Sequence, residues 1–246
     1  MPVIDIAPTP IYISECPFHD RVKSLFLEEI EKHDGHKNPL SEGLTHIDHY
    51  SVLSDDKFSR FKTWVEQCAE DFVVNTLGYY LPENMQVSDS WINICQENGW
   101  QEPHYHANAT ISCVYYVNFE QGKHADTYFA ARPRLGLASY PSSPLIQMVH
   151  DRETKYNQFD CVTGQEGCLF MWESHVLHGF KPNIHPDRVT VAMNLIPTVV
   201  SNGDYGWRVN NLTPEERKIS ADKWAEGKLW DTPNVFPQDG LPRDVY

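Results

Sequence analysis

The stretch Gly99-Trp100-Gln101-Glu102-Pro103-His104-Tyr105-His106 places two histidines one residue apart. On an extended strand alternate side chains share a face, so both imidazoles would lie on one side of a sheet. A third imidazole is available at His178, which follows the apolar run Gly167–Trp172. Imidazole suits iron, zinc, copper and nickel. The spacing therefore predicts a metal site with two ligands from one strand and one from a distant strand.

Arg188 stands ten residues beyond His178, at the start of a predicted strand. The planar guanidinium of an arginine can bind a carboxylate through two parallel, charge-assisted hydrogen bonds. A metal held on one face by three protein ligands keeps its opposite face open, as non-haem Fe(II) oxygenases require. These residues together predict a site for a 2-oxo acid, whose remote carboxylate meets Arg188, and for dioxygen.

Length and composition favour an ordinary globular protein. The 246 residues are 41% hydrophobic and 22% charged, which allows a substantial buried core. The net charge of −14 argues against binding to nucleic acid or to an anionic membrane surface. No apolar run approaches the ~20 residues that span a bilayer, and the first residues do not read as a secretion signal.

The cysteines point to a reducing compartment. They are scattered without a Cys-x-x-Cys pair, as expected for buried thiols rather than for a disulfide framework or a zinc ribbon. The six are Cys16, Cys68, Cys95, Cys113, Cys161 and Cys168. We therefore expect a cytoplasmic protein.

The N-terminal third predicts an edge strand and two helices that pack on a sheet. Apolar residues within 3–14, interrupted by prolines, suit the strand. Apolar residues then recur at helical spacing over about 19–33, and again after Ser54, which we expect to cap the second helix. The polar segment 35–51 between these helices predicts a loop.

The polar segment contains His46-Ile47-Asp48, which matches the His-x-Asp metal pair of many iron enzymes. No apolar strand is evident around it, and a helix follows closely. We prefer the interpretation of a solvent-facing or hydrogen-bonded loop, with the metal pair as the alternative.

From residue 85 onward the sequence predicts short strands and turns, typical of a sandwich or barrel. The expected strands are 85–96, 110–119, 128–131, 145–149, 158–162, 168–172 and 189–196. Thr213-Pro214 followed by Glu216 predicts a capping box and a helix over about 214–226. No repeat or shift in composition marks a second domain, so we expect one domain over 1–246.

The motifs resemble the prolyl-hydroxylase-like branch of the Fe(II)/2-oxoglutarate-dependent oxygenases. The similarity rests on Asn98-Gly99 before His104, the strand Val114–Asn118, the run that leads to His178, and Arg188. It is greatest to a group known mainly from marine bacteria and phages, whose motif reads His-x-His where relatives have His-x-Asp. The resemblance implies a mainly β double-stranded β-helix, a jelly-roll variant, over 85–198, flanked by an N-terminal segment, 1–84, and a C-terminal segment, 199–246.

The resemblance also implies roles for individual residues. His104 and His178 would ligate Fe(II), and Arg188 would bind the distal carboxylate of 2-oxoglutarate. Tyr116 matches a tyrosine that helps to hold this carboxylate, and Thr190, one strand period after Arg188, would face the same side. Such enzymes consume dioxygen and 2-oxoglutarate, release succinate and carbon dioxide, and hydroxylate a second substrate, here a peptidyl residue or a small molecule.

His106 departs from the family pattern, which has a carboxylate there. A neutral imidazole leaves one less negative charge beside Fe(II), which weakens metal binding. Three alternatives stay open: His106 completes a three-histidine site, water or Asp126 takes its place, or the site only binds. The functional alternatives are a non-catalytic jelly-roll module that binds a metal or carboxylate, and a three-histidine metalloenzyme independent of 2-oxoglutarate. The sequence does not decide the oligomeric state.

Overall fold

The computed structural model describes residues 9–37, 41–47, 51–130, 160–202, 204–213 and 215–219. Internal contacts divide the chain into two compact units, 1–209 and 210–246. The expectation of one domain with segments 1–84, 85–198 and 199–246 stays a prediction. No helix in the described ranges is long and apolar enough to cross a membrane.

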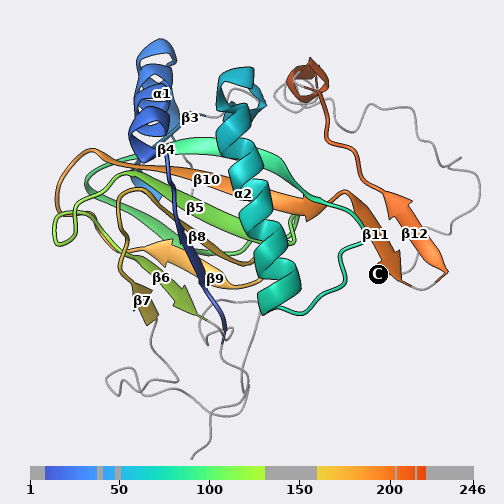
Figure 1. Cartoon of the computed structure of the whole chain (residues 1–246). Helices are drawn as coiled ribbons and strands as arrows, with labels where there is room; N and C mark the ends of the chain where they lie inside the picture. The colour runs from blue at the N-terminus through green and yellow to red at the C-terminus, as the bar shows by residue number, and fades with distance from the viewer. Residues whose placement is uncertain are drawn as a thin grey trace, which may run out of the picture. The chain divides into compact units, whose positions relative to one another are not determined.

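The first unit is mainly β-strand, with two long helices near the N-terminus (Figure 1). Its strands are β1 (Tyr12–Glu15), β2 (His36–Lys37), β3 (Ser41–Ile47), β4 (Met85–His104), β5 (Ile111–Asn118), β6 (Thr127–Ala130), β7 (Asp160–Val162), β8 (Cys168–Glu173), β9 (Leu177–Phe180), β10 (Arg188–Pro197), β11 (Val199–Asn202) and β12 (Tyr205–Arg208). Its helices are α1 (His19–Lys32), η1 (Val52–Ser54), η2 (Asp56–Phe58), α2 (Ser59–Asp71) and the π-helical turn η3 (Phe72–Thr76).

The strands of the main sheet pair antiparallel in the order β1-β8-β5-β10-β4-β9-β6-β7, and β3 pairs with β4 and β2. The long strand β4 pairs with β10 along Met85–Cys95 and with β9 at Gln101 and His104. It therefore joins the two halves of the sheet between which the predicted site lies. A curled antiparallel main sheet and the two-stranded sheet of β11 and β12, with few helices in the described residues, confirm the predicted mainly β class.

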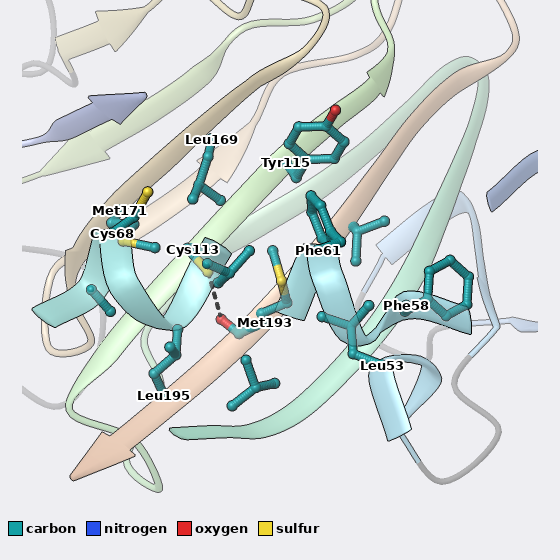
Figure 2. Packing of buried hydrophobic residues seen from close by; sticks show 14 of the residues in the cluster. Leu53, Phe58, Phe61, Cys68, Cys113, Tyr115, Leu169, Met171, Met193 and Leu195 are labelled. Atoms are coloured by element: carbon teal, nitrogen blue, oxygen red, sulfur yellow. Dashed lines mark hydrogen bonds between the residues drawn. The ribbon is translucent and has the colours of Figure 1, made fainter. Parts of the chain in front are cut away.

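The main hydrophobic core lies between α2 and the sheet. Figure 2 shows Phe61 and Cys68 of α2 close to Cys113 and Tyr115 of β5 and to Met193 of β10. All five side chains are at most 7% exposed. Neighbouring residues along these strands point to the opposite face, because side chains alternate. The core thus fixes one face of β5 and β10 and leaves the other face to the candidate site.

The second helix begins later than the sequence predicts. Ser54 ends a 3-10 turn, and its hydroxyl donates to the carbonyl of Ser51. Asp55 caps the next turn, because its Oδ1 accepts the Lys57 N–H at 3.0 Å. The helix α2 starts at Ser59 without a side-chain cap. The predicted Ser54 cap is therefore wrong, since two 3-10 turns stand between it and the helix.

The predicted loop over 35–51 is wrong where β3 runs. Leu44 and Ile47 of this strand are 1% and 2% exposed, and β3 pairs with the middle of β4. The sequence hides the strand because Gly43, at φ 62°, coincides with a register shift between Glu42 and Leu44. Such an irregularity breaks the alternation of apolar and polar residues by which strands are recognised.

The other predicted strands compare as follows. Segments 85–96, 110–119, 168–172 and 189–196 correspond to β4, β5, β8 and β10. The described part of 128–131 overlaps β6, which begins one residue earlier, and the described part of 158–162 is β7. The segment 145–149 lies outside the described residues.

In the second unit, Thr213 and Glu216 form the predicted capping box. The Thr213 N–H donates to Glu216 Oε2 at 2.8 Å, and the Glu216 N–H donates to Thr213 Oγ1 at 3.3 Å. Helix is described over 215–219, and the rest of the predicted helix lies outside the described residues.

A bulge divides β4 before its last residues. Asn98 has φ 62°, its N–H donates to the carbonyl of Asn183 at 2.7 Å, and the Asn183 N–H donates to Gly99 O at 2.8 Å. A Cβ on Gly99 would stand 2.6 Å from Cys95 Sγ and 2.7 Å from Gly43 O. The bulge therefore requires glycine at 99, and it precedes the residues that pair with β9.

Replacement of this glycine should destabilise the fold. We expect Gly99→Ala to lower the free energy of unfolding by about 1–3 kcal/mol, because the added methyl overpacks a backbone contact. Urea denaturation measures the loss. Gly206→Ala is the matched control, since its nearest contact would be 3.2 Å, and equal losses in both variants would contradict the steric account.

Candidate metal centre

Strand pairing brings His104 and His178 together. They are Cα partners across β4 and β9, and their ring centroids lie 4.3 Å apart. His106 follows two residues after the end of β4, with its ring centroid 5.2 Å from that of His104 and 5.1 Å from that of His178. One nitrogen of each ring lies within 4.8 Å of those of the other two. The three predicted histidines thus form one cluster.

Hydrogen bonds at the opposite ring nitrogens indicate how the imidazoles are protonated. Nδ1 of His104 lies 2.9 Å from Glu102 O, and Nδ1 of His178 lies 2.9 Å from Val176 O. A carbonyl oxygen only accepts, so Nδ1 carries the proton in both rings and Nε2 keeps its lone pair. Trp172 Nε1 also lies 3.2 Å from His178 Nδ1, but an indole N–H could donate there only if Nδ1 were unprotonated. We assign the proton to Nδ1 because the bond to the Val176 carbonyl is shorter.

Burial keeps the three imidazoles neutral. It lowers the pKa of His104 to about 4, with a smaller contribution from His106. Burial also lowers the pKa of His106. Burial and the neighbouring His104 and His106 rings hold the pKa of His178 well below its usual value. Neutral imidazole is the form that binds metals, so the cluster is ready to ligate near pH 7.

Arg188 lies in the same cavity, at the start of β10. It is 2% exposed, its Nε donates to Ala125 O at 3.0 Å, and its guanidinium carbon lies 4.3 Å from the centre of the Phe180 ring. In the described residues of the chain it forms no ion pair with a carboxylate. Burial lowers its pKa. A buried cation without a paired anion is costly, so this position favours an anionic ligand.

Tyr116 and Thr190 lie near Arg188. They are Cα partners across β5 and β10, and both are at most 1% exposed. The Tyr116 hydroxyl is 2.7 Å from Thr127 Oγ1, and the guanidinium carbon of Arg188 is 5.7 Å from the tyrosine ring centre. Thr127 and Thr190 line the cavity, whereas the Tyr116 hydroxyl is joined to it through Thr127.

The cavity walls are contributed by strands from both halves of the sheet. They are Trp91, Asn93, Gln101 and His104 of β4, Ser112, Cys113 and Val114 of β5, Thr127 of β6, Trp172 of β8, His178, Gly179 and Phe180 of β9, Arg188, Thr190 and Ala192 of β10, and His106 between β4 and β5. Among these described residues there is no aspartate or glutamate. The carboxylates of Asp126 and Asp89 act on Arg188 and on His106 from outside these walls, so a carboxylate inside the cavity formed by the described residues would belong to a ligand.

Other candidates lie outside the cluster. The Asp126 carboxylate accepts the Gly164 N–H at 3.2 Å, and it is not among the clustered ligands. His46 belongs to β3 and also lies outside the cluster, while Asp48 is outside the described residues. His175 is exposed in the turn before β9. Within the described residues, only the three histidines form a group of this kind.

Sequence reasoning missed three polar residues of the site. Trp91 and Asn93 line the cavity, and Asn194 accepts a hydrogen bond from the His106 ring. The spacing places Asn194 three strand periods after Arg188, on the same predicted face, but its contact with His106 and the pairing of Asn93 with Thr190 appear only in the structure. Two of their polar atoms, Trp91 Nε1 and Asn93 Oδ1, are buried without a hydrogen-bond partner among the described residues.

The donor set fits a divalent transition metal. Three neutral imidazoles present nitrogens on one side of a cavity, and their Nδ1 atoms are bonded to oxygen acceptors, which is the usual support for metal-ligating histidine. Three protein ligands leave further coordination positions for small molecules.

Comparison with known proteins agrees with this geometry. Residues 89–194 match the family described as "Putative 2OG-Fe(II) oxygenase". That span contains His104, His106, His178 and Arg188. No curated protein sequence matches the chain.

Solved structures show the same jelly-roll fold. A Pseudomonas putida prolyl-4-hydroxylase is 12% identical with a TM-score of 0.52, over 76% of this chain and 92% of that one. Streptomyces hygroscopicus HygX with nickel, 2-oxoglutarate and hygromycin B is 11% identical with a TM-score of 0.53, over 84% and 94%. The epimerase SnoN of nogalamycin biosynthesis, described as non-haem and α-ketoglutarate-dependent, is 10% identical with a TM-score of 0.54, over 84% and 88%.

Metal binding should stabilise the folded chain through these histidines. We expect Co(II) without oxygen to raise the free energy of unfolding by ~2.7 kcal/mol at a hundredfold excess over Kd. His104→Ala and His178→Ala should lose most of this gain, whereas the exposed control His175→Ala should keep it. Thermal unfolding with and without metal measures the effect. Equal stabilisation of wild type and His104→Ala would contradict the assignment.

Proposed function

We propose that this chain, an enzyme of the 2-oxoglutarate/Fe(II) oxygenase type, is a hydroxylase in which His104, His106 and His178 hold Fe(II). Arg188 binds the distal carboxylate of 2-oxoglutarate, and Thr190 and Tyr116 support that carboxylate end. The observation that carries the proposal is the buried Arg188 guanidinium in the cavity that the three-histidine cluster also lines.

The charges support a dianionic co-substrate. Arg188 has no carboxylate partner among the described residues, and no acidic residue is found among the described cavity walls. Among the described residues, the guanidinium donates through its Nε to Ala125 O and interacts with the Tyr116 side chain, which leaves further donors of its planar group for a carboxylate. A bound dicarboxylate would thus supply the missing anion.

Each component of the site has a defined task. Fe(II), when bound, supplies the oxidative chemistry that joins decarboxylation of 2-oxoglutarate by dioxygen to hydroxylation of the second substrate. Arg188 orients the co-substrate through its distal carboxylate, and Thr190 lies in the same cavity, where its hydroxyl can assist. The apolar walls, such as Phe180 and Trp172, exclude water from the reacting groups.

We propose a peptidyl residue or a small molecule as the second substrate, since a net charge of −14 disfavours nucleic acid. A cytoplasmic location is also proposed. It is supported by six free cysteines in the described residues, five of them buried.

Spectroscopy of Fe(II) and 2-oxoglutarate tests the assignment directly. Anaerobic addition of both to wild type should give a visible charge-transfer band, and the chain should consume 2-oxoglutarate in air. Arg188→Ala should weaken 2-oxoglutarate binding by about 2–5 kcal/mol, because it removes the buried partner of a carboxylate. Arg208→Ala is the control, because Arg208 is an exposed arginine whose side chain pairs with Glu83.

The outcomes separate the alternatives. A wild-type chain with neither band nor turnover of 2-oxoglutarate, yet stabilised by metal, would instead be the non-catalytic binding module. Oxidation activity that persists undiminished in Arg188→Ala would identify a three-histidine enzyme independent of 2-oxoglutarate.

A further inference from the structure

The His106 ring is hydrogen-bonded to a buried network of polar side chains. Its Nδ1 is hydrogen-bonded to Oδ1 of Asn194 on β10. Ser112 Oγ donates to the same Oδ1 at 3.4 Å and lies 2.8 Å from Ser174 Oγ. Asn194, Ser112 and Ser174 are 3%, 1% and 2% exposed. Buried polar groups of this kind are expected to be mutually satisfied.

The donors and acceptors of this polar network follow from the orientation of the Asn194 side-chain amide, whose Oδ1 faces both His106 and Ser112. Ser112 has a single hydroxyl proton, which it gives to Asn194, so Ser174 must donate to Ser112. Oδ1 of Asn194 can only accept, so the bond from His106 places the proton on Nδ1. The lone pair of His106 therefore lies on Nε2, as in His104 and His178.

Ser174 fixes the backbone of His106 as well. The His106 N–H donates to Ser174 O at 2.9 Å, and the Ser174 N–H donates to Thr110 O at 3.0 Å. Trp91 stacks on the ring, with centroids 5.9 Å apart and an interplanar angle of 28°. The main chain, the ring plane and the ring nitrogen are thus each restrained.

We propose that Asn194 is the positioning residue that makes His106 a metal ligand, by selecting the tautomer and orientation in which Nε2 faces the ion. This inference rests on the proposed metal site. A carboxylate can ligate through either oxygen, whereas an imidazole must present one particular unprotonated nitrogen. A fixed acceptor behind the ring therefore keeps the unprotonated Nε2 of His106 available to the ion.

Metal affinity tests the proposal without reference to activity. The whole 246-residue chain is titrated anaerobically with Co(II), whose visible spectrum reports its ligands. Asn194→Leu should weaken Co(II) binding about 10- to 100-fold. Asn194→Asp should bind at least as tightly as wild type, because a carboxylate also accepts the Nδ1 proton. Loss of affinity in Asn194→Asp equal to that in Asn194→Leu would overturn the proposal.

Ser88→Ala is the matched control. The Ser88 hydroxyl donates to the backbone carbonyl of Asn194 at 3.2 Å. The substitution therefore removes a buried hydrogen bond to Asn194 and leaves the side-chain amide of Asn194 unchanged. We expect unchanged Co(II) affinity in Ser88→Ala. If Asn194→Leu does not fold, Ser112→Ala replaces it, with an expected loss smaller than the about 10- to 100-fold loss in Asn194→Leu, because Ser112 acts on His106 only through Asn194. A loss in Ser88→Ala as large as in these variants would reduce Asn194 to a general structural role and overturn the proposal.

A double-mutant cycle shows whether Asn194 acts through His106. In the His106→Ala background, Asn194→Leu should cause no further loss of Co(II) affinity. The same loss in both backgrounds would overturn the proposal while leaving a metal site in place. Absence of Co(II) binding by wild type would instead contradict the proposed function itself, so the two failures are distinguishable.

Discussion

The antiparallel pairing of β4 with β9 is the constraint on which the site depends, because it sets His104 directly across from His178. A one-residue slip in a strand would turn one of these imidazoles to the other face of the sheet. Two features fix this register. The bulge at Asn98-Gly99 exchanges two backbone hydrogen bonds with Asn183, and Gln101 of β4 pairs with Phe180 of β9. Residues far from any ligand therefore determine whether the histidines meet.

The turn between β8 and β9 organises two of the three imidazoles. Val176 O accepts from the His178 ring, and Ser174 O accepts from the backbone of His106. With three neutral rings and no acidic residue among the described cavity walls, a divalent ion and Arg188 would together face a dicarboxylate. A site with only neutral protein ligands would hold the metal less tightly than one that includes a carboxylate, and it would attract an anionic co-substrate more strongly.

The structure brings His104, His106 and His178 into one cluster. Tyr116 was expected only from the family resemblance. The sequence itself predicted that His104 and His106 share a face and that Thr190 faces the same side as Arg188, because a period of two fixes which residues of a strand share a face. It did not reveal β3, whose alternation is broken at Gly43, nor the 3-10 turns that displace the start of α2 beyond Ser54. Asn194 was missed for a different reason. Its partner His106 is 88 residues away, and only the pairing of β10 with β4 and β5 brings the two together.

The central claim is that three imidazoles, including His106, hold one Fe(II) ion. X-ray absorption spectroscopy of the anaerobically Fe(II)-loaded chain counts the imidazole ligands most directly. The account predicts three imidazoles in wild type and two in His106→Ala. Two imidazoles in wild type, with a spectrum unchanged by His106→Ala, would contradict it.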